Sequence, residues 1–379
     1  MQIPLTVPFF SSEEKEALLH AFDEGKIIGN GTISKRVQEQ VQQLFGVKHV
    51  LLTPSCTAAL EMSMLALDIG PGDEVIMPSF TFVSAANCVV LRGATPIFAE
   101  IKPDTLNIDP EDIRRCITPR TKVIMPMHYA GVGCDMDEIM KIAKEHNLYV
   151  VEDAAQGVDA LYQDQYLGTI GDIGCYSFHG TKNITCGEGG AFLTNDDEIA
   201  RKAEIIQEKG TNRAAFIKGR VDKYSWVSVG SSYVLSDLLA AVLEAQLVKR
   251  SDVKQARELI YNRYINDLSS LAAREIIQLP VIPDGRESNY HLFFFRVTDK
   301  DTRDELLDRL RKRGIGASFH YVPLHSSPFG KELIPVPESR GLSLTEKISN
   351  GLIRLPIYPD LKPSEIEYII YETTKLIRD

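Results

Sequence analysis

The sequence predicts an α/β protein that is built around a mostly parallel sheet and carries a second, smaller domain. Between residues 45 and 195, short apolar runs alternate with amphipathic stretches, the runs being "HVLLTPS", "DEVIMPS", "ATPIFAE", "KVIMPMHYA", "LYVVEDAA", "GCYSFH" and "GGAFLTN". Helical patterns such as "TAALEMSMLALDIG" and "DEIMKIAKEHN" lie between several of them, with apolar residues at intervals of three and four. This alternation indicates βαβ units whose sheet is covered on both faces.

The rest of the chain divides less regularly. Residues 206–232 have no clean period, and we expect a mobile loop or an intersubunit contact there. A helical pattern resumes over 236–268 with Ser236 as its N-cap. After it, "HLFFFRVT" and "ASFHYVPL" predict strands and "TRDELLDRLRKRG" predicts a helix that ends at Gly314. Because 379 residues are enough for two cores, we expect a large domain over 1–245 and a small C-terminal α/β domain over 246–379.

Composition excludes several classes of function. The chain has 42 Lys and Arg against 52 Asp and Glu, and no basic run that could neutralise a row of phosphates, so we expect no nucleic-acid partner. The N-terminal stretch lacks the features of a secretory signal, and no apolar run approaches the roughly 20 residues of a membrane span. We expect a soluble, cytoplasmic protein. The six cysteines form no C-x-x-C pair, which favours reduced, buried thiols and no metal site.

Two strand ends in the first half carry candidate binding groups. In "TPSCTAALEM" a strand ends and Ser55, Cys56 and Thr57 open a helix, whose free N–H groups would bind a phosphate. In "MPSFTFVSAAN", Phe82 follows a strand and could stack on a flat heteroaromatic ring. Taken alone, the first stretch is more often an ordinary N-cap and the second more often core packing.

Two later strand ends carry charge. In "VVEDAAQG", Glu152 and Asp153 close an apolar strand and face opposite sides of the sheet, and a buried carboxylate requires a cationic or hydrogen-bonding partner. In "SFHGTKNITCGEGG", Ser177 could bind phosphate, and Lys182 precedes glycines that let the backbone pass close to a bound group. A single lysine is usually a surface residue, so Lys182 indicates covalent chemistry only in combination with the other strand ends.

The combination matches one cofactor. A phosphate-binding helix start, a stacking aromatic ring, a carboxylate for a pyridine nitrogen, and a strand-end serine and lysine are the parts that a pyridoxal 5'-phosphate site requires. Lys182 would hold the cofactor as a Schiff base, and the carboxylate would keep the ring nitrogen protonated, so that the ring acts as an electron sink.

The same residues resemble a known family. "EDAAQ", "SFHGTKN", "GEGGAF", "GDEVIMPSFTFVS", "PMHYAG" and "YVPLHSSP" together resemble the DegT/DnrJ/EryC1/StrS nucleotide-sugar aminotransferases, over essentially the whole chain. The resemblance implies the aspartate-aminotransferase fold, type I of the pyridoxal-phosphate-dependent transferases. "LLTPSCTAALEM", "EKGTNR" and "VDKYSW" look closest to members that form dTDP-4-amino-4,6-dideoxy-D-galactose for surface polysaccharides.

The resemblance assigns roles to particular residues. The Schiff-base lysine falls on Lys182 and the pyridinium carboxylate on Asp153. The remaining cofactor contacts would be the phenolic oxygen at Gln156, ring stacking at Phe82, and the phosphate at Ser177, Cys56 and Thr57. Near the sugar nucleotide the resemblance places His320, Tyr321 and His325. An acidic protein needs local cations to bind anionic substrates, and the candidate contacts to the donor carboxylate or the diphosphate are Lys209, Arg213, Lys223 and Tyr224.

The implied reaction is ping-pong transfer of an amino group from L-glutamate to C4 of a dTDP-4-keto-6-deoxy hexose, through pyridoxamine 5'-phosphate. A homodimer with active sites at the interface is also implied. Many relatives place an asparagine of the neighbouring subunit on the phosphate, whereas "GSSYVLSD" has Val234 at that position, and Ser231 or Ser232 would substitute only if the loop differs.

Alternatives remain on the same scaffold. A sister enzyme would aminate C3 or use a GDP- or UDP-keto sugar. Family members that act as sugar dehydratases have histidine in place of the lysine, and Lys182 argues against that chemistry. A non-catalytic regulatory protein with this fold would not need the full set of Lys182, Asp153 and Ser177.

Overall fold

A seven-stranded sheet forms the centre of the protein, which is described here from a computed structural model covering residues 2–25, 27–217, 219–333 and 341–378. The strands lie in the order β1-β9-β8-β5-β4-β2-β3. Their bounds are β1 His49–Thr53, β2 Glu74–Pro78, β3 Thr95–Ala99, β4 Thr121–Ile124, β5 Tyr149–Asp153, β8 Ile173–Ser177 and β9 Gly190–Thr194. Each of the seven predicted apolar runs forms one of these strands.

The sheet is parallel except at one strand. β2 pairs in parallel with β3 and β4, and the parallel series continues from β4 through β5 to β8. β9 runs antiparallel to both of its neighbours, β8 and β1. The carboxyl ends of six strands therefore meet at one edge of the sheet, where α/β proteins bind their ligands.

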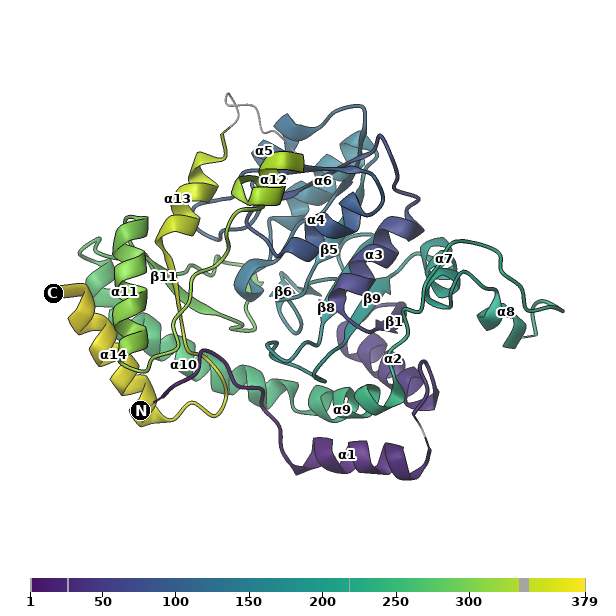
Figure 1. Ribbon diagram of the computed structural model, residues 1–379, viewed down its shortest axis with the longest axis horizontal. Coiled ribbons are helices and arrows are strands. Elements are labelled where there is room, and N and C mark those ends of the chain that lie inside the picture. Colours follow the sequence, from purple (N-terminus) through teal and green to yellow (C-terminus); the bar gives the residue numbers. More distant parts are fainter. Residues whose placement is uncertain (1, 26, 218, 334–340, 379) are drawn as a thin grey trace.

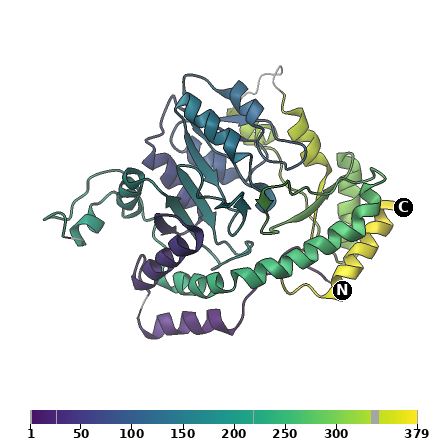
Figure 2. The ribbon, with the colours of Figure 1, turned by 180° about the vertical axis from the view of Figure 1, so that it is seen from behind.

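Helices cover both faces of the sheet, as predicted (Figures 1 and 2). One face packs against α3 (Cys56–Ala66), α4 (Val83–Val90) and α7 (Asp197–Gln207). The other packs against α2 (Thr32–Phe45), α5 (Pro110–Cys116), α6 (Met136–His146) and α9 (Asp237–Val248). α1 (Ser12–Asp23) packs on the outer side of α9.

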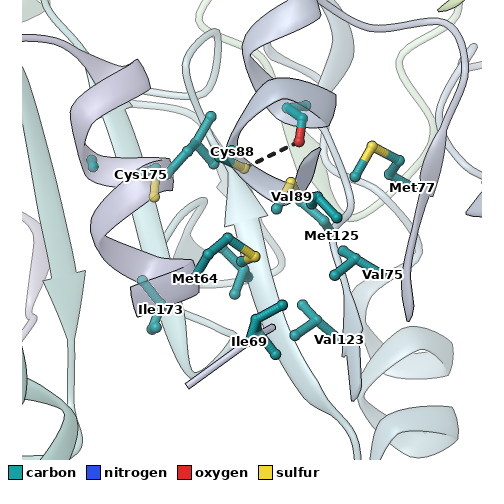
Figure 3. Packing of buried hydrophobic residues seen from close by; sticks show 14 of the residues in the cluster. Met64, Ile69, Val75, Met77, Cys88, Val89, Val123, Met125, Ile173 and Cys175 are labelled. Atoms are coloured by element: carbon teal, nitrogen blue, oxygen red, sulfur yellow. Dashed lines mark hydrogen bonds between the residues drawn. The ribbon is translucent and has the colours of Figure 1, made fainter. Parts of the chain in front are cut away.

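Strand alternation separates the two layers of core. Val75 and Met77 point to the layer that contains α3 and α4, whereas Ile76 between them points to the opposite layer. Figure 3 shows the first layer, in which Cys88 lies among methionine and aliphatic side chains and donates to Ala85 O at 3.1 Å. All six cysteines are free and buried, as the sequence predicts.

The C-terminal elements form a core of their own with Ile3 of the N-terminal segment. This core is formed by α10 (Arg250–Ala272), α11 (Lys300–Lys312), α14 (Pro363–Arg378) and the antiparallel pair β11 (Phe293–Arg296) and β12 (Leu352–Leu355). The helices α12 (Pro328–Leu333) and α13 (Ser343–Gly351) lie outside it, and Ile348 of α13 packs in a separate cluster with Phe294. A small sheet of β6 (Leu161–Tyr162), β7 (Gln165–Tyr166) and β10 (Arg286–Glu287) lies beside the large one. The domain boundary at 245/246 stays a prediction.

Two predictions about local structure are corrected. The pattern over 236–268 forms two helices, because the chain leaves helical geometry at Lys249 (φ −90°, ψ 4°), although Ser236 caps α9 as predicted. The expected strand "ASFHYVPL" is not a strand, because only Ser318 pairs, with Arg354, and a short 3₁₀ turn (Leu324–Ser326) follows.

The irregular stretch over 206–232 extends away from the sheet (Figure 1). It contains one short helix, α8 (Arg213–Ile217), and is closed by isolated pairs between Glu208 and Ser232 and between Thr211 and Trp226. Trp226 is 78% exposed, whereas a tryptophan on the surface of a monomeric protein is usually much more buried. Within the described residues, no helix has both the length and the apolar character that crossing a membrane demands.

A buried carboxylate holds the start of α2 against α9, and its removal should destabilise the protein. Asp237 accepts from the backbone N–H groups of Gly31, Ile33 and Ser34, each at 3.0 Å. We expect Asp237→Ala to lower the free energy of unfolding by about 2–4 kcal/mol, because three buried donors lose a charged acceptor. The exposed local cap Asp196 is the matched control, and Asp196→Ala should cost about 1 kcal/mol. If urea denaturation shows the same loss of unfolding free energy for both variants, the buried cap is no more important than the exposed one.

Candidate active site

A cavity of about 550 Å³ opens at the carboxyl edge of the sheet. The starts of α3 and α4 and the ends of β5 and β8 form one wall, and the segment around residue 320 with β12 forms the other. The structure brings together the predicted lysine, all six predicted cofactor residues and two predicted substrate residues: Lys182, Cys56, Thr57, Phe82, Asp153, Gln156, Ser177, His320 and Tyr321.

The start of α3 is arranged to bind an anion. The Ser55 hydroxyl accepts from Ala58 N–H at 3.1 Å and so caps the helix. Within the described chain, the N–H groups of Cys56 and Thr57 have no hydrogen-bond acceptor, and they lie at the positive end of the helix. Gly190 passes so close that a Cβ there would lie 2.5 Å from Cys56 N. The strand therefore needs glycine at this position, as the sequence indicates.

Glu152 and Asp153 face opposite sides of β5 and have different surroundings. The Glu152 carboxylate accepts from His128 Nε2 at 2.8 Å and from three backbone N–H groups, so it is fully satisfied inside the protein. Asp153 lines the cavity and accepts from only one group in the described chain, the Ala155 N–H at 3.1 Å. Burial raises the pKa of Asp153 against the opposing effect of that N–H and the Lys182 charge. Asp153 is the carboxylate that still requires a partner.

Lys182 lies in the same cavity with no hydrogen bond from its Nζ to the described residues. Burial lowers the pKa of Lys182; the neighbouring Cys56 and Asp153 oppose this shift, and the Arg354 charge adds to it. The amine is therefore more easily neutral than that of an exposed lysine, which a nucleophile or a proton acceptor requires.

The C-terminal wall holds neutral polar rings. Gln156 accepts from Ala130 N–H and donates to the Tyr321 hydroxyl at 2.9 Å, and the Tyr321 ring stacks on His320 with centroids 3.8 Å apart. Burial, with the charges of Arg354 and Lys182, lowers the pKa of His320 to about 2. His320 is thus a neutral imidazole beside the cavity, in contact with the Tyr129 hydroxyl.

Sequence reasoning missed two residues of this wall. Arg354, on β12, lines the cavity; its Nε has no hydrogen-bond partner, and burial lowers its pKa. His291 lines the cavity and contacts Asn183, the residue that follows Lys182. An arginine inside the apolar run "LIRLPIYP" was a readable signal, since a charge rarely interrupts a buried strand without a function. No feature of the sequence around His291 indicates that it lies in the site.

Five predicted substrate residues are not brought into this cavity. Lys209 and Arg213 form ion pairs with Glu208, at 3.7 and 3.0 Å, in the projecting stretch. Lys223 and Tyr224 are exposed at its far part. His325 contacts Ser79 at 2.7 Å and Glu346 at 3.3 Å, behind the cavity wall. Their contact with substrate stays a prediction.

The residues present fit pyridoxal phosphate. The cavity provides an anion site at α3, an under-satisfied carboxylate, a half-buried lysine with an easily neutralised amine, and Phe82, a residue that is 58% exposed although it lines the cavity. The fold and site together define a pyridoxal-phosphate-dependent aminotransferase of fold type I.

Comparisons with known proteins agree. Residues 9–373 match the model of the DegT/DnrJ/EryC1/StrS aminotransferase family, and the chain belongs to this family. It is 33% identical to the spore coat polysaccharide biosynthesis protein SpsC of Bacillus subtilis (strain 168), over 99% of this chain and 97% of that protein.

Solved structures are similar over the full length. The aminotransferase TlmJ from Streptoalloteichus hindustanus has a TM-score of 0.91 at 29% identity, covering 100% of this chain and 99% of that one. The PLP-form of Spr1654 from Streptococcus pneumoniae has a TM-score of 0.91 at 26% identity, with coverages of 100% and 99%. The protein is a PLP-dependent sugar aminotransferase of this family, and its fold class is confirmed.

The lowered pKa of Lys182 predicts how fast cofactor-free protein takes up pyridoxal phosphate. Because only the neutral amine attacks an aldehyde, the rate should rise with pH and level off below the value of 10.5 that an exposed lysine would give. Arg354→Gln should shift this profile to higher pH and Asp153→Asn to lower pH, since each removes a charge that acts on the amine. Stopped-flow absorbance measures the rates; a plateau unmoved by both variants would contradict the assigned electrostatics.

Proposed function

We propose that this aminotransferase moves an amino group from L-glutamate to C4 of a dTDP-4-keto-6-deoxy hexose and forms dTDP-4-amino-4,6-dideoxy-D-galactose for surface polysaccharide. The observation that carries the proposal is the cavity in which Lys182 and Asp153 face a wall of neutral rings and one unpaired arginine. Such a cavity can take a charged amino acid and an uncharged sugar ring in turn.

Arg354 supports an amino acid as the donor. A guanidinium with a buried nitrogen that lacks a hydrogen-bond partner is costly, and an anionic ligand removes that cost. The anion must lie near the nitrogen that reacts at Lys182. The α-carboxylate of an amino acid is two bonds from its nitrogen, whereas the diphosphate of a 4-amino sugar nucleotide lies across the sugar ring. We therefore assign Arg354 to the α-carboxylate of glutamate.

Two considerations support the sugar acceptor. The resemblance in "LLTPSCTAALEM" and "VDKYSW" is to members that aminate C4 of a dTDP-keto sugar. The relative SpsC is a spore coat polysaccharide biosynthesis protein, which is compatible with an amino sugar for a surface polymer.

A homodimer would complete the site. Exposed apolar side chains gather on two parts of the chain, the helix and turn at the N-terminal end and the projecting stretch, including Phe22, Ile28, Trp226 and Val229. A second copy of the chain would bury them and bring Lys209, Arg213, Lys223 and Tyr224 toward the partner's cavity. Val234 packs against Gly29 and offers no hydrogen bond to a phosphate.

The residues of this chain would divide the work. The N–H groups of Cys56 and Thr57, together with Ser177, would hold the cofactor phosphate. Asp153 would bind the ring nitrogen, Phe82 would stack on the ring, and Gln156 would contact the phenolic oxygen. When bound, the cofactor supplies an electron sink for the reacting carbon. Lys182 Nζ takes the proton from the α carbon of the donor in the first half-reaction and gives one to the aminated sugar carbon in the second.

Purified protein should be yellow, and its visible band should fade with L-glutamate and return with the keto sugar nucleotide. Lys182→Ala should abolish both changes, whereas Lys202→Ala, at a surface lysine paired with Asp68, should leave them intact.

A panel of dTDP-, GDP- and UDP-keto sugars, with the product configuration solved by NMR, tests the acceptor. Preferred amination at C3 or of a GDP or UDP sugar would contradict the proposed substrate, and a protein that stays colourless with added cofactor would contradict the chemistry.

The donor assignment has its own test. Arg354→Gln should raise the L-glutamate concentration for half-saturation about 10- to 100-fold, because a charge-assisted hydrogen bond is lost. With isoglutamine, which lacks the α-carboxylate, the variant and the wild type should react alike. Arg296→Gln is the control, since Arg296 lies on the neighbouring strand, donates to Pro103 O, and is outside the cavity. If the difference vanishes with L-glutamine instead, Arg354 binds the side-chain carboxylate.

A further inference from the structure

The backbone beside His291 is strained. Tyr290 has φ of +54°, a left-handed conformation that is unfavourable for a bulky residue. Such strain persists only where the surroundings hold it, and it concentrates at functional sites. Because Tyr290 turns the chain between Asn289 and His291, the strained residue determines where the His291 ring points. The ring lines the cavity.

Buried hydrogen bonds hold this turn from both sides. Arg257, itself buried, donates to Tyr290 O at 2.9 Å and to His291 O at 2.6 Å. The Asn289 amide donates to Gln156 O and Val158 O, and its Oδ1 accepts from His291 N–H at 3.0 Å. The position of the ring is thus fixed by the side chains of Arg257 and Asn289, which form no other hydrogen bonds to the described residues.

Asn183 fixes which ring nitrogen carries the proton. Its Nδ2 donates to Asn289 O at 2.7 Å, and a carbonyl oxygen only accepts, so the orientation of the amide is determined. Its Oδ1 therefore faces His291 Nδ1, at 3.0 Å. Because Oδ1 is an acceptor, Nδ1 must donate, and the neutral ring carries its lone pair on Nε2.

The surroundings of the His291 ring favour its neutral form. Burial, followed by the charges of Lys182, Arg257 and Arg354, holds the pKa of His291 well below its usual value. Nε2 has no hydrogen-bond partner within the described residues. Arg354 and the protonated form of Lys182, which line the same cavity, carry donors only, and neither donates to Nε2. His291 Nε2 is thus a hydrogen-bond acceptor in the cavity that no described residue satisfies.

We propose that His291 binds the sugar hydroxyl next to the reacting keto carbon, which donates its hydrogen to Nε2. Glutamate does not provide this donor, since its carboxylates only accept and its nitrogen is the reacting atom. A keto hexose carries a hydroxyl on the carbon beside the keto group, two bonds from the carbon that reacts at Lys182. The inference rests on the proposed function and makes His291 a determinant for the acceptor half-reaction alone.

The two half-reactions separate this role from a structural one. His291→Phe keeps a ring but removes the acceptor, and kcat/KM for the keto sugar should fall about 10- to 100-fold, because a site built for a hydroxyl loses its partner. The glutamate half-reaction should change less than about 3-fold, since no neutral acceptor contacts the donor. His291→Gln places an amide oxygen near the position of Nε2 and should restore most of the loss.

A substrate that lacks the hydroxyl tests whether His291 and the hydroxyl interact with each other. With the keto sugar nucleotide that has hydrogen in place of the hydroxyl next to the keto carbon, wild type and His291→Phe should react equally. A persisting difference would overturn the proposal. Equal losses in both half-reactions would also overturn it, because His291 would then hold Lys182 or the fold. Thermal midpoints and the bound cofactor's absorbance verify that each variant is folded and loaded.

Failure of the proposed function would look different. If the wild type reacts with glutamate but aminates no keto sugar, the proposed acceptor is wrong, and the hydroxyl assignment falls with it. If the wild type aminates a keto sugar and His291→Phe does so equally well, only the role of His291 is wrong.

Discussion

Charge that lacks a partner inside one cavity is the constraint on which this site depends. Lys182, Arg354 and Asp153 lie in one cavity, yet none forms an ion pair there with another described residue. We propose that ligands complete this arrangement: the carboxylate would pair with the cofactor ring, the guanidinium with a donor carboxylate, and the lysine would form a covalent bond. The rest of the structure supplies the rigidity that keeps these groups apart. Glu152, by contrast, is satisfied on the far face of the same strand and serves the fold.

One cavity must accept two dissimilar substrates in turn, and its walls reflect this. The sheet side is polar and directional, with the start of α3 and the end of β5 aimed at a common centre. The opposite side offers the Arg354 cation and the neutral rings of His320, Tyr321 and His291, and a hydrogen bond to Asn183 fixes the proton of His291. Neutral rings interact with hydroxyl groups without repelling the carboxylates of the first substrate.

Much of this could be predicted from the sequence, for identifiable reasons. The strands of the large sheet are buried on both faces and so appear as continuous apolar runs, and parallel strands bring their carboxyl ends to one edge. Lys182, Asp153, Thr57 and Phe82 follow from that rule. Arg354 and His291 do not, because their positions depend on how the C-terminal elements dock on the sheet. The break at Lys249 and the unpaired stretch after Ser318 are also set by tertiary packing, which a local pattern does not record.

The central claim is that Lys182 is the covalent attachment point within this cavity. Borohydride reduction of cofactor-loaded protein fixes the cofactor to the lysine that holds it, and mass spectrometry of the digest then locates the modified residue. The account predicts that the added mass lies in the peptide that contains "SFHGTKNITCGEGG", at Lys182, and that L-glutamate added before reduction prevents the labelling. Label on another lysine, or none in a yellow protein, would contradict it.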